Sequence, residues 1–187
     1  VTVVENKQLL HNKTDYVGKL LATEQGLKDD NSSTSSPDAV RKGDEIILKN
    51  INVRFWLSNK DDRPNVIYKG ILFWYDVTNP PSDATVYFTQ TNKMLDRYNT
   101  EQISIVDTFI VKSTNNYAVD ANNHEKSYLA TLNKSWKVKQ IKYDEGGVQP
   151  KFKDLGFALV AYDAFGTLQT DNIASYAYNC KLSFKDP

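Results

Sequence analysis

Two long runs, 50–57 and 66–75, constrain the fold of this chain more than any other stretch. In the first run every second residue is apolar: Ile51, Val53, Phe55 and Leu57. This period of two is that of a β-strand with one buried face. The second run is apolar at positions of both parities, and the residues between the runs, SNKDDRPN, favour a turn. The stretch predicts two long strands, paired as a hairpin or lying in opposite sheets of a sandwich.

The rest of the chain continues this pattern of strands and polar loops. We expect further strands at 16–24, 103–112, 128–143, 155–165 and 174–184, and a short strand or helical turn within 86–99. Within 128–143 the apolar parity changes, which indicates a bulge or bend near Lys139. Four polar segments are predicted to be long loops, namely 28–39, 76–85, 113–127 and 144–154.

Roughly seven or eight strands separated by turns predict an all-β protein. The chain of 187 residues is expected to form a single domain, 1–187. Its aromatic content of 12% favours strands, because flat rings pack well across a pleated sheet. Long loops favour a jelly roll, a β-sandwich of two four-stranded antiparallel sheets, over an up-and-down barrel.

The charge and the cysteine content exclude several kinds of protein. Lys plus Arg and Asp plus Glu are both 23, so the sequence has no overall field that attracts a polyanion. The single cysteine, Cys180, excludes an internal disulfide and lies on the expected inward face of the last strand. No apolar run is long enough for a membrane helix, so we expect no membrane insertion.

We find no pattern typical of catalysis. His11 and His124 lie in polar stretches without a second ligand at metal spacing, and we expect both to be solvated loop residues. The sequence contains no nucleophile elbow, P-loop or dinucleotide fingerprint. Acidic pairs such as Asp61 and Asp62 lie in predicted turns, where solvation is the simplest explanation. The sequence therefore predicts no enzymatic activity, no metal site and no cofactor.

The segment KSWKVKQIK is the strongest candidate binding site. It interleaves lysines with an aromatic ring, as a contact to single-stranded nucleic acid would use charge for phosphate and a ring for a base. The alternative is a solvated strand face whose tryptophan belongs to the core. The candidate nucleic-acid-binding residues are Lys134, Trp136, Lys137, Lys139 and Lys142, together with Arg54 in the first long run.

Over residues 16–187 the chain resembles the capsid proteins of circovirus-like, circular Rep-encoding single-stranded DNA viruses. The resemblance is carried, in order, by LATEQG, a polar loop, RKGDEIILKNINVRFWL, DRPNVIYKGILFWYD, the strand of Trp136, LGFALVAYDAFGTL and the ending NCKLSFKDP. It implies a single jelly roll, about 60 copies of which assemble into a small icosahedral shell around circular single-stranded DNA.

The resemblance also implies a basic arm before Val1 that lies against the genome, with residues 1–15 as the segment that follows it. The expected location is the virion, and the host nucleus or cytoplasm during assembly. A rival function is a jelly-roll module that binds carbohydrate or another ligand through exposed aromatics such as Trp56 or Trp74. A cupin-type enzyme is disfavoured because the clustered histidines that hold its metal are missing.

Overall fold

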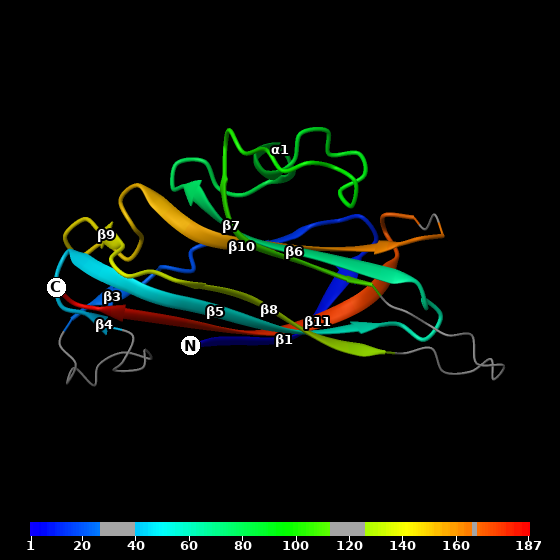
Figure 1. Cartoon of the computed structure of the whole chain (residues 1–187), viewed down its shortest axis with the longest axis horizontal. Helices are drawn as coiled ribbons and strands as arrows, with labels where there is room; N and C mark the ends of the chain where they lie inside the picture. Colours follow the sequence, from blue (N-terminus) through cyan, green and yellow to red (C-terminus); the bar gives the residue numbers. More distant parts are fainter. Residues whose placement is uncertain (27–39, 113–125, 166–167) are drawn as a thin grey trace.

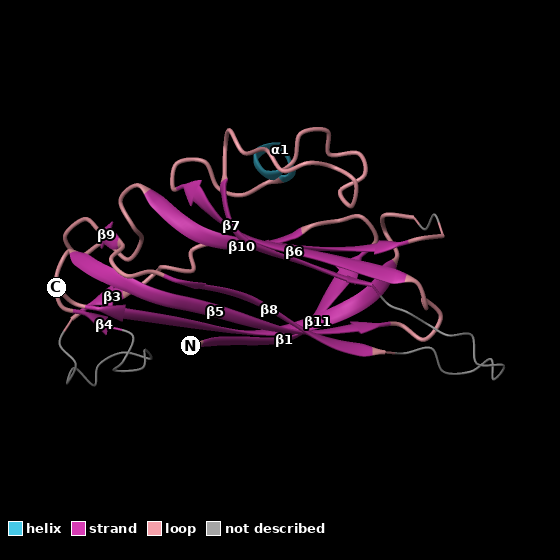
Figure 2. Cartoon of the chain, viewed as in Figure 1, coloured by secondary structure: helices cyan, strands magenta, loops and turns pink. Residues whose placement is uncertain are grey.

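The computed structural model describes residues 1–26, 40–112, 126–165 and 168–187. Two antiparallel sheets pack face to face (Figure 1, Figure 2). The first contains five strands in the order β1-β11-β5-β8, with β9 pairing the start of β5, and the second has the order β2-β10-β6-β7. The all-β sandwich is therefore confirmed. The expectation of four strands in each sheet is wrong for the first, because β9 adds a fifth.

The strands differ widely in length. The long ones are β1 (Thr2–Leu10), β5 (Glu45–Asn59), β6 (Val66–Asp76), β7 (Ser104–Lys112), β8 (Ser127–Ser135), β10 (Lys153–Asp163) and β11 (Asn172–Lys185). The short ones are β2 (Asp15–Val17), β9 (Gln140–Lys142) and the parallel pair β3 (Glu24–Gln25) and β4 (Val40–Arg41). One short helix, α1 (Asp83–Val86), follows β6.

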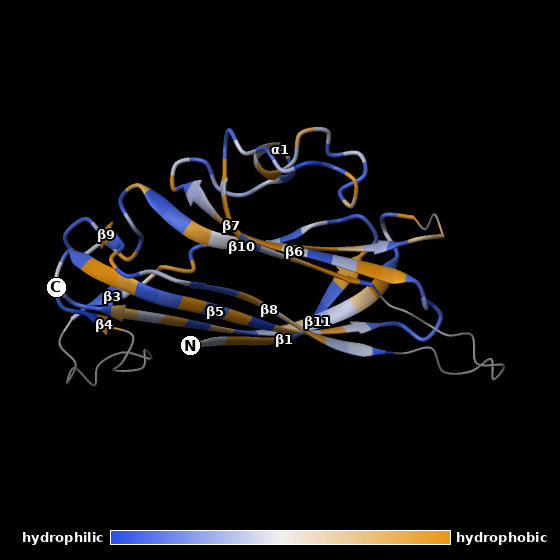
Figure 3. Ribbon diagram, viewed as in Figure 1, coloured by the Kyte–Doolittle hydropathy of each residue, from blue (hydrophilic) through white to orange (hydrophobic). Residues whose placement is uncertain are grey.

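The two long runs form β5 and β6, and they lie in opposite sheets rather than in a hairpin. The alternation along β5 is confirmed: Ile51, Val53, Phe55 and Leu57 are at most 1% exposed, whereas Trp56 is 57% exposed. Figure 3 shows the same alternation of apolar and polar residues along the ribbon. The inward side chains meet those of β6 and β10 and form the core between the sheets.

The four-stranded sheet is buried on both faces, which explains why its central strands are apolar at both parities. Its inner face belongs to the sandwich core. Its outer face is covered by residues 77–103, which we call the crossover and which contain α1 (Figure 1). Ile71 and Phe73 of β6 pack there against Val86 and Tyr87. The crossover thus forms a third layer that the alternation pattern did not predict.

Two expected strands differ from the structure. The expected strand at 16–24 is confirmed only at its start, where β2 pairs with β10, and its length is wrong because the chain then turns away from the sheet. The expected strand at 128–143 is interrupted between β8 and β9, although both parts pair with β5. This interruption takes the place of the predicted bulge. The strand β1 was not predicted, because most of its side chains are exposed at the edge of the sheet.

Strands at 103–112, 155–165 and 174–184 are confirmed as β7, β10 and β11 within one or two residues. Proline-rich residues after Asp76 end β6 as expected. Within 86–99 the expected helical turn is present at 92–96, where the main-chain N–H of Asp96 donates to the carbonyl of Asn92 (2.8 Å), and Tyr87 and Tyr98 make an isolated bridge. The predicted loop at 28–39 and most of the loop at 113–127 lie outside the described residues.

Candidate nucleic-acid interface

The lysine-rich segment 134–142 lies where the first sheet is interrupted. After β8 ends, the chain stops pairing with β5, and it pairs with β5 again at β9. The main-chain N–H of Trp136 donates to the carbonyl of Lys49 (2.8 Å), and the N–H of Leu48 donates to the carbonyl of Lys139 (2.8 Å). Both ends of the interruption are therefore fixed to the same strand.

Trp136 packs against Trp74 at the end of β6. The ring centroids are 5.9 Å apart and the planes meet at 65°, an edge-on arrangement. The Lys139 ammonium lies 5.1 Å from the centroid of the Trp74 ring, close enough for a cation–π contact. Both tryptophans are half-buried and pack on the sandwich core, as the alternative explanation of Trp136 expected. These contacts join the two sheets at one end of the sandwich.

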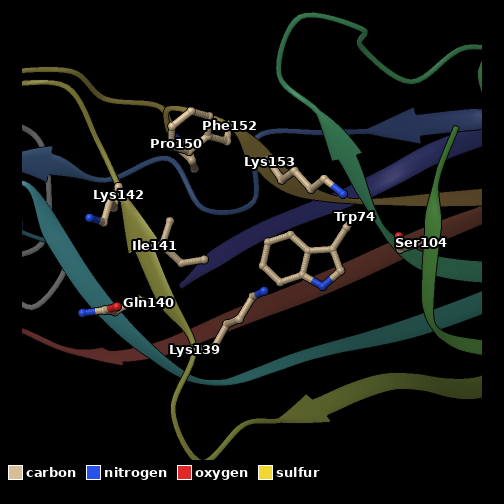
Figure 4. A pocket seen from close by; sticks show the side chains of 9 residues that line it. All are labelled: Trp74, Ser104, Lys139, Gln140, Ile141, Lys142, Pro150, Phe152 and Lys153. Atoms are coloured by element: carbon tan, nitrogen blue, oxygen red, sulfur yellow. The ribbon is translucent and has the colours of Figure 1, made fainter.

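A cavity of about 410 Å³, which we call the mouth cavity, opens beside these rings (Figure 4). Trp74 and Phe152 supply aromatic surface, and three lysines supply positive charge. In Figure 4 the side chains of Lys139 and Lys153 extend toward Trp74. The full lining is Trp74, Ser104, Lys139, Gln140, Ile141, Lys142, Pro150, Phe152 and Lys153.

Carboxylates neutralise part of the charge of the mouth cavity. Lys142 forms an ion pair with Glu45 (3.1 Å). Lys153 stands opposite Asp76 in the sheet. The pKa of Asp76 is lowered, chiefly by hydrogen bonds from Thr78 and to a smaller extent by Lys153. In the part of the chain that the structure describes, Lys139 and Lys153 have no carboxylate at salt-bridge distance, so both are more available to an incoming anion than Lys142.

The chemistry of the mouth cavity suits an anion that carries a flat ring. Ammonium groups attract phosphate, and an exposed ring such as Phe152, which is 62% exposed, can stack on a nucleobase. The mouth cavity can therefore hold such a ligand.

The structure separates the six predicted site residues. Lys139 and Lys142 line the mouth cavity, and Trp136 reaches it only through Trp74. Lys134 and Lys137 have exposed side chains that do not line it. Arg54 lies on the outer face of the first sheet, between Thr131 and Asn179 of the neighbouring strands. The six residues thus belong to different surfaces rather than to one site.

Three residues of the mouth cavity were missed as partners of the lysine segment. Phe152 and Lys153 come from the loop before β10 and its first residue, which no spacing connects with residues 134–142. Trp74 was expected only as an exposed platform for a sugar, but it is half-buried against Trp136. The contact depends on pairing between distant strands, which a linear motif does not encode.

One expected loop histidine has a structural role. His11 is buried, which lowers its pKa, and its Nδ1 accepts a hydrogen bond from the main-chain N–H of Asp163 (3.0 Å). The expectation that His11 is solvated is wrong, and His124 lies outside the described residues. Cys180 is buried as predicted, and burial raises the pKa of its thiol to about 11.

The described ranges contain neither a candidate metal site nor a candidate membrane-spanning helix. Their His, Cys, Asp and Glu residues form no group of three or more that could hold a metal ion. No helix in those ranges has the length and apolar character needed to span a membrane. Asp61 and Asp62 lie in the exposed turn between β5 and β6, where they had been expected.

Comparison with known proteins did not identify a family. No family model matches the chain, and no curated protein matches it.

Proposed function

We propose that this chain is a viral capsid protein, and that about 60 copies of it form an icosahedral shell around circular single-stranded DNA. The observation that carries the proposal is the nested pairing of its eight principal strands. In chain order, the first pairs with the eighth (β1 with β11) and the second with the seventh (β2 with β10). The third pairs with the sixth (β5 with β8), and the fourth with the fifth (β6 with β7).

Such nesting is what results when one long hairpin is wrapped around a core. It is the double Greek key pattern of a jelly roll, the domain type used by many viral capsids. We therefore propose the jelly roll as the finer description of this sandwich, with β3, β4 and β9 as additions to it. The sequence resemblance to circovirus-like capsid proteins supports the same assignment.

The distribution of exposed apolar side chains also supports assembly. A subunit of a closed shell contacts neighbours on several sides, so it needs apolar surface in several places. Beyond the strands of the described surface, large apolar residues at least 70% exposed include Val1, Leu95, Val138, Phe165 and Leu168. A module that binds one ligand needs only one such patch.

The 187 residues have a formal net charge of zero, so they do not neutralise the negative charge of an enclosed genome. In the proposed particle this neutralisation comes mainly from a basic arm before Val1, and the virion is the protein's final location. Host nucleus or cytoplasm would be the place of assembly. The proposal assigns the chain no catalytic activity.

Electron microscopy tests the proposal. The protein, expressed with a basic segment added before Val1, should form closed particles of uniform diameter. A protein that remains monomeric across protein and salt concentrations would rule out the shell.

The second candidate is a carbohydrate-binding module. The exposure of Trp56, 57%, favours it, because sugars stack on exposed aromatic rings. Binding of a neutral glycan by the monomer on a glycan array, lost in Trp56→Ala, would support this candidate over the capsid.

A further inference from the structure

The outer face of the first sheet is a flat polar surface across three adjacent strands. We call it the open face. It consists of the outward positions of β5 from Asn50 to Ser58 and their register partners on β8 and β11. Its fifteen residues are Asn50, Asn52, Arg54, Trp56 and Ser58 of β5, Ser127, Leu129, Thr131, Asn133 and Ser135 of β8, and Ser175, Ala177, Asn179, Lys181 and Ser183 of β11.

Ten of these fifteen residues are Asn, Ser or Thr, and none is a carboxylate. The only charged members are Arg54 and Lys181, and both are exposed. Asp107 of β7 approaches the edge of the face, where its carboxylate accepts the main-chain N–H of Asn133 (2.8 Å). At the other edge, β1 pairs with β11, and its exposed Glu5 lies in the bulge beside Ala177. Arg54 and Lys181 are thus the charged members of the face and the carboxylates lie at its edges, which leaves the face itself suited to an anion.

An apolar row crosses the open face. Trp56 stands directly opposite Leu129 on one side and Ala177 on the other. Trp56 is 57% exposed and Leu129 is 86% exposed, so both present their surfaces to solvent. Arg54 is two residues from Trp56 on the same face, a separation of about 7 Å along a strand. A ring and a cation are thus adjacent on a rigid support.

The outer face of the other sheet differs in this respect. The crossover covers it, and the side chains beneath are buried (Figure 1). No described segment covers the open face in the same way. In the sandwich, the first sheet is therefore the one whose outer face can meet an extended partner.

We propose that the open face binds a single-stranded polynucleotide, with a base stacked on Trp56 and phosphates near Arg54 and Lys181. Stacking on an aromatic ring tolerates any base, and amide and hydroxyl groups can bond to base edges. Two cations on the face, with carboxylates only at its edges, favour a polyanion over a neutral sugar. The inference rests on the proposed function for the identity of the strand as the viral genome, and it then orients the subunit with this face toward the particle interior.

The experiment measures fluorescence anisotropy of labelled oligothymidylate and oligouridylate, each of about 30 nucleotides, against the 187-residue chain. Trp56→Ala should weaken binding by about 5- to 150-fold, the range typical of one lost stacking contact. The plot of log K against log salt concentration should have a slope of about −1.4, which corresponds to two neutralised phosphates on a single strand. Arg54→Gln combined with Lys181→Gln should bring that slope close to zero.

Two controls separate this face from other surfaces. Phe88→Ala removes an exposed ring from the crossover and should leave binding unchanged. Lys60→Gln removes a cation from the exposed turn after β5, outside both the open face and the mouth cavity, and should also leave binding unchanged. Equal binding by Trp56→Ala and the wild type, or loss of binding only in Lys60→Gln, would overturn the proposal, as would binding of neutral glycans but not oligonucleotides.

The capsid proposal and the proposal that the open face binds nucleic acid can be contradicted separately. Particles that form while the chain binds no oligonucleotide would overturn the open face alone. Oligonucleotide binding that depends on Trp56 in a chain that never assembles would overturn the capsid function and leave the binding surface standing. The relative binding of the two oligonucleotides then shows whether DNA or RNA is preferred.

Discussion

The ammonium group of Lys69 lies 4.4 Å from the centroid of the Tyr98 ring. The same group donates hydrogen bonds to the main-chain carbonyls of Lys93 (3.1 Å), Met94 (3.4 Å) and Asp96 (3.0 Å). Lys69 belongs to β6, whereas its four partners belong to the crossover. Burial lowers its pKa, and the negative charge of Asp96 opposes that effect. This lysine fastens the crossover to the outer face of the four-stranded sheet.

Replacement of this lysine should loosen the crossover. Lys69→Met keeps most of the side-chain volume but leaves three carbonyls without their donor, which should lower the free energy of unfolding by about 3 kcal/mol. Urea denaturation measures the difference. Lys60→Met, at an exposed position in the turn after β5, is the control and should change the free energy of unfolding by less than about 0.5 kcal/mol. Equal effects of the two variants would contradict the role of Lys69.

Gly70 should not tolerate a side chain. A Cβ atom there would lie 2.3 Å from Cε1 of Phe109, its neighbour on β7. Phe109 also packs against Phe55 in the core, with ring centroids 5.4 Å apart, so it cannot move freely. Gly70→Ala should therefore destabilise the protein by about 1 to 3 kcal/mol.

Thermal unfolding of Gly70→Ala, compared with Gly43→Ala, tests this packing. A Cβ atom on Gly43 meets no atom of the described residues within 4 Å, so the control should unfold like the wild type. Adding Phe109→Leu to Gly70→Ala should recover part of the loss, since a smaller side chain vacates the space. An equal unfolding temperature for Gly70→Ala and the control would contradict the close packing of Phe109 against Gly70.

Asp154 should make the fold less stable as pH rises from 5 to 7.5. It is 1% exposed, and burial raises its pKa to about 6, although N–H groups of Leu21 (3.0 Å) and Leu155 (2.7 Å) donate to its Oδ1 and oppose that shift. Among the described residues, no group donates a hydrogen bond to its Oδ2. A carboxyl group whose pKa is higher in the folded than in the unfolded state stabilises the fold at pH values below its unfolded-state pKa. This stabilisation is lost as the pH rises through the folded-state pKa of about 6.

The variant Asp154→Asn keeps an acceptor for both N–H groups and cannot ionise. Between pH 5 and pH 7.5 the wild type should lose about 1 kcal/mol of unfolding free energy relative to this variant. Urea titrations at the two pH values give the comparison, in which the other carboxylates cancel. A wild type and a variant that change in parallel would show that Asp154 does not titrate in this range.

The sequence predicted the strands best where one face meets the core and the other meets solvent. The alternation of Val53 and Phe55 with Arg54 and Trp56 identified β5, and Cys180 was correctly placed inside on β11. The strand β1 was missed because it lies at a sheet edge and Leu9 is its only buried residue. Its bulge near Asn6, where φ is 56°, further disrupts the period of two.

The binding surfaces were harder to predict than the strands. The lysine segment was visible in the sequence, but its tryptophan packs on Trp74 across the sandwich. Arg54 and Trp56 were recognised separately, one for nucleic acid and one for sugar. The period of two already puts both on the outward face of β5, and strand pairing, which no local pattern specifies, adds Leu129 and Ala177 beside Trp56. Long-range register is thus the information that the sequence pattern lacked.

The mass of the assembled protein tests the central claim most directly. Sedimentation velocity of the protein, with a basic segment added before Val1, should show a closed particle of about 60 chains. At 21.3 kDa for each chain of 187 residues, that particle has a mass of about 1.3 MDa plus the mass of the added segments and nucleic acid. A single species near the mass of one chain, at every protein and salt concentration, would contradict the capsid function.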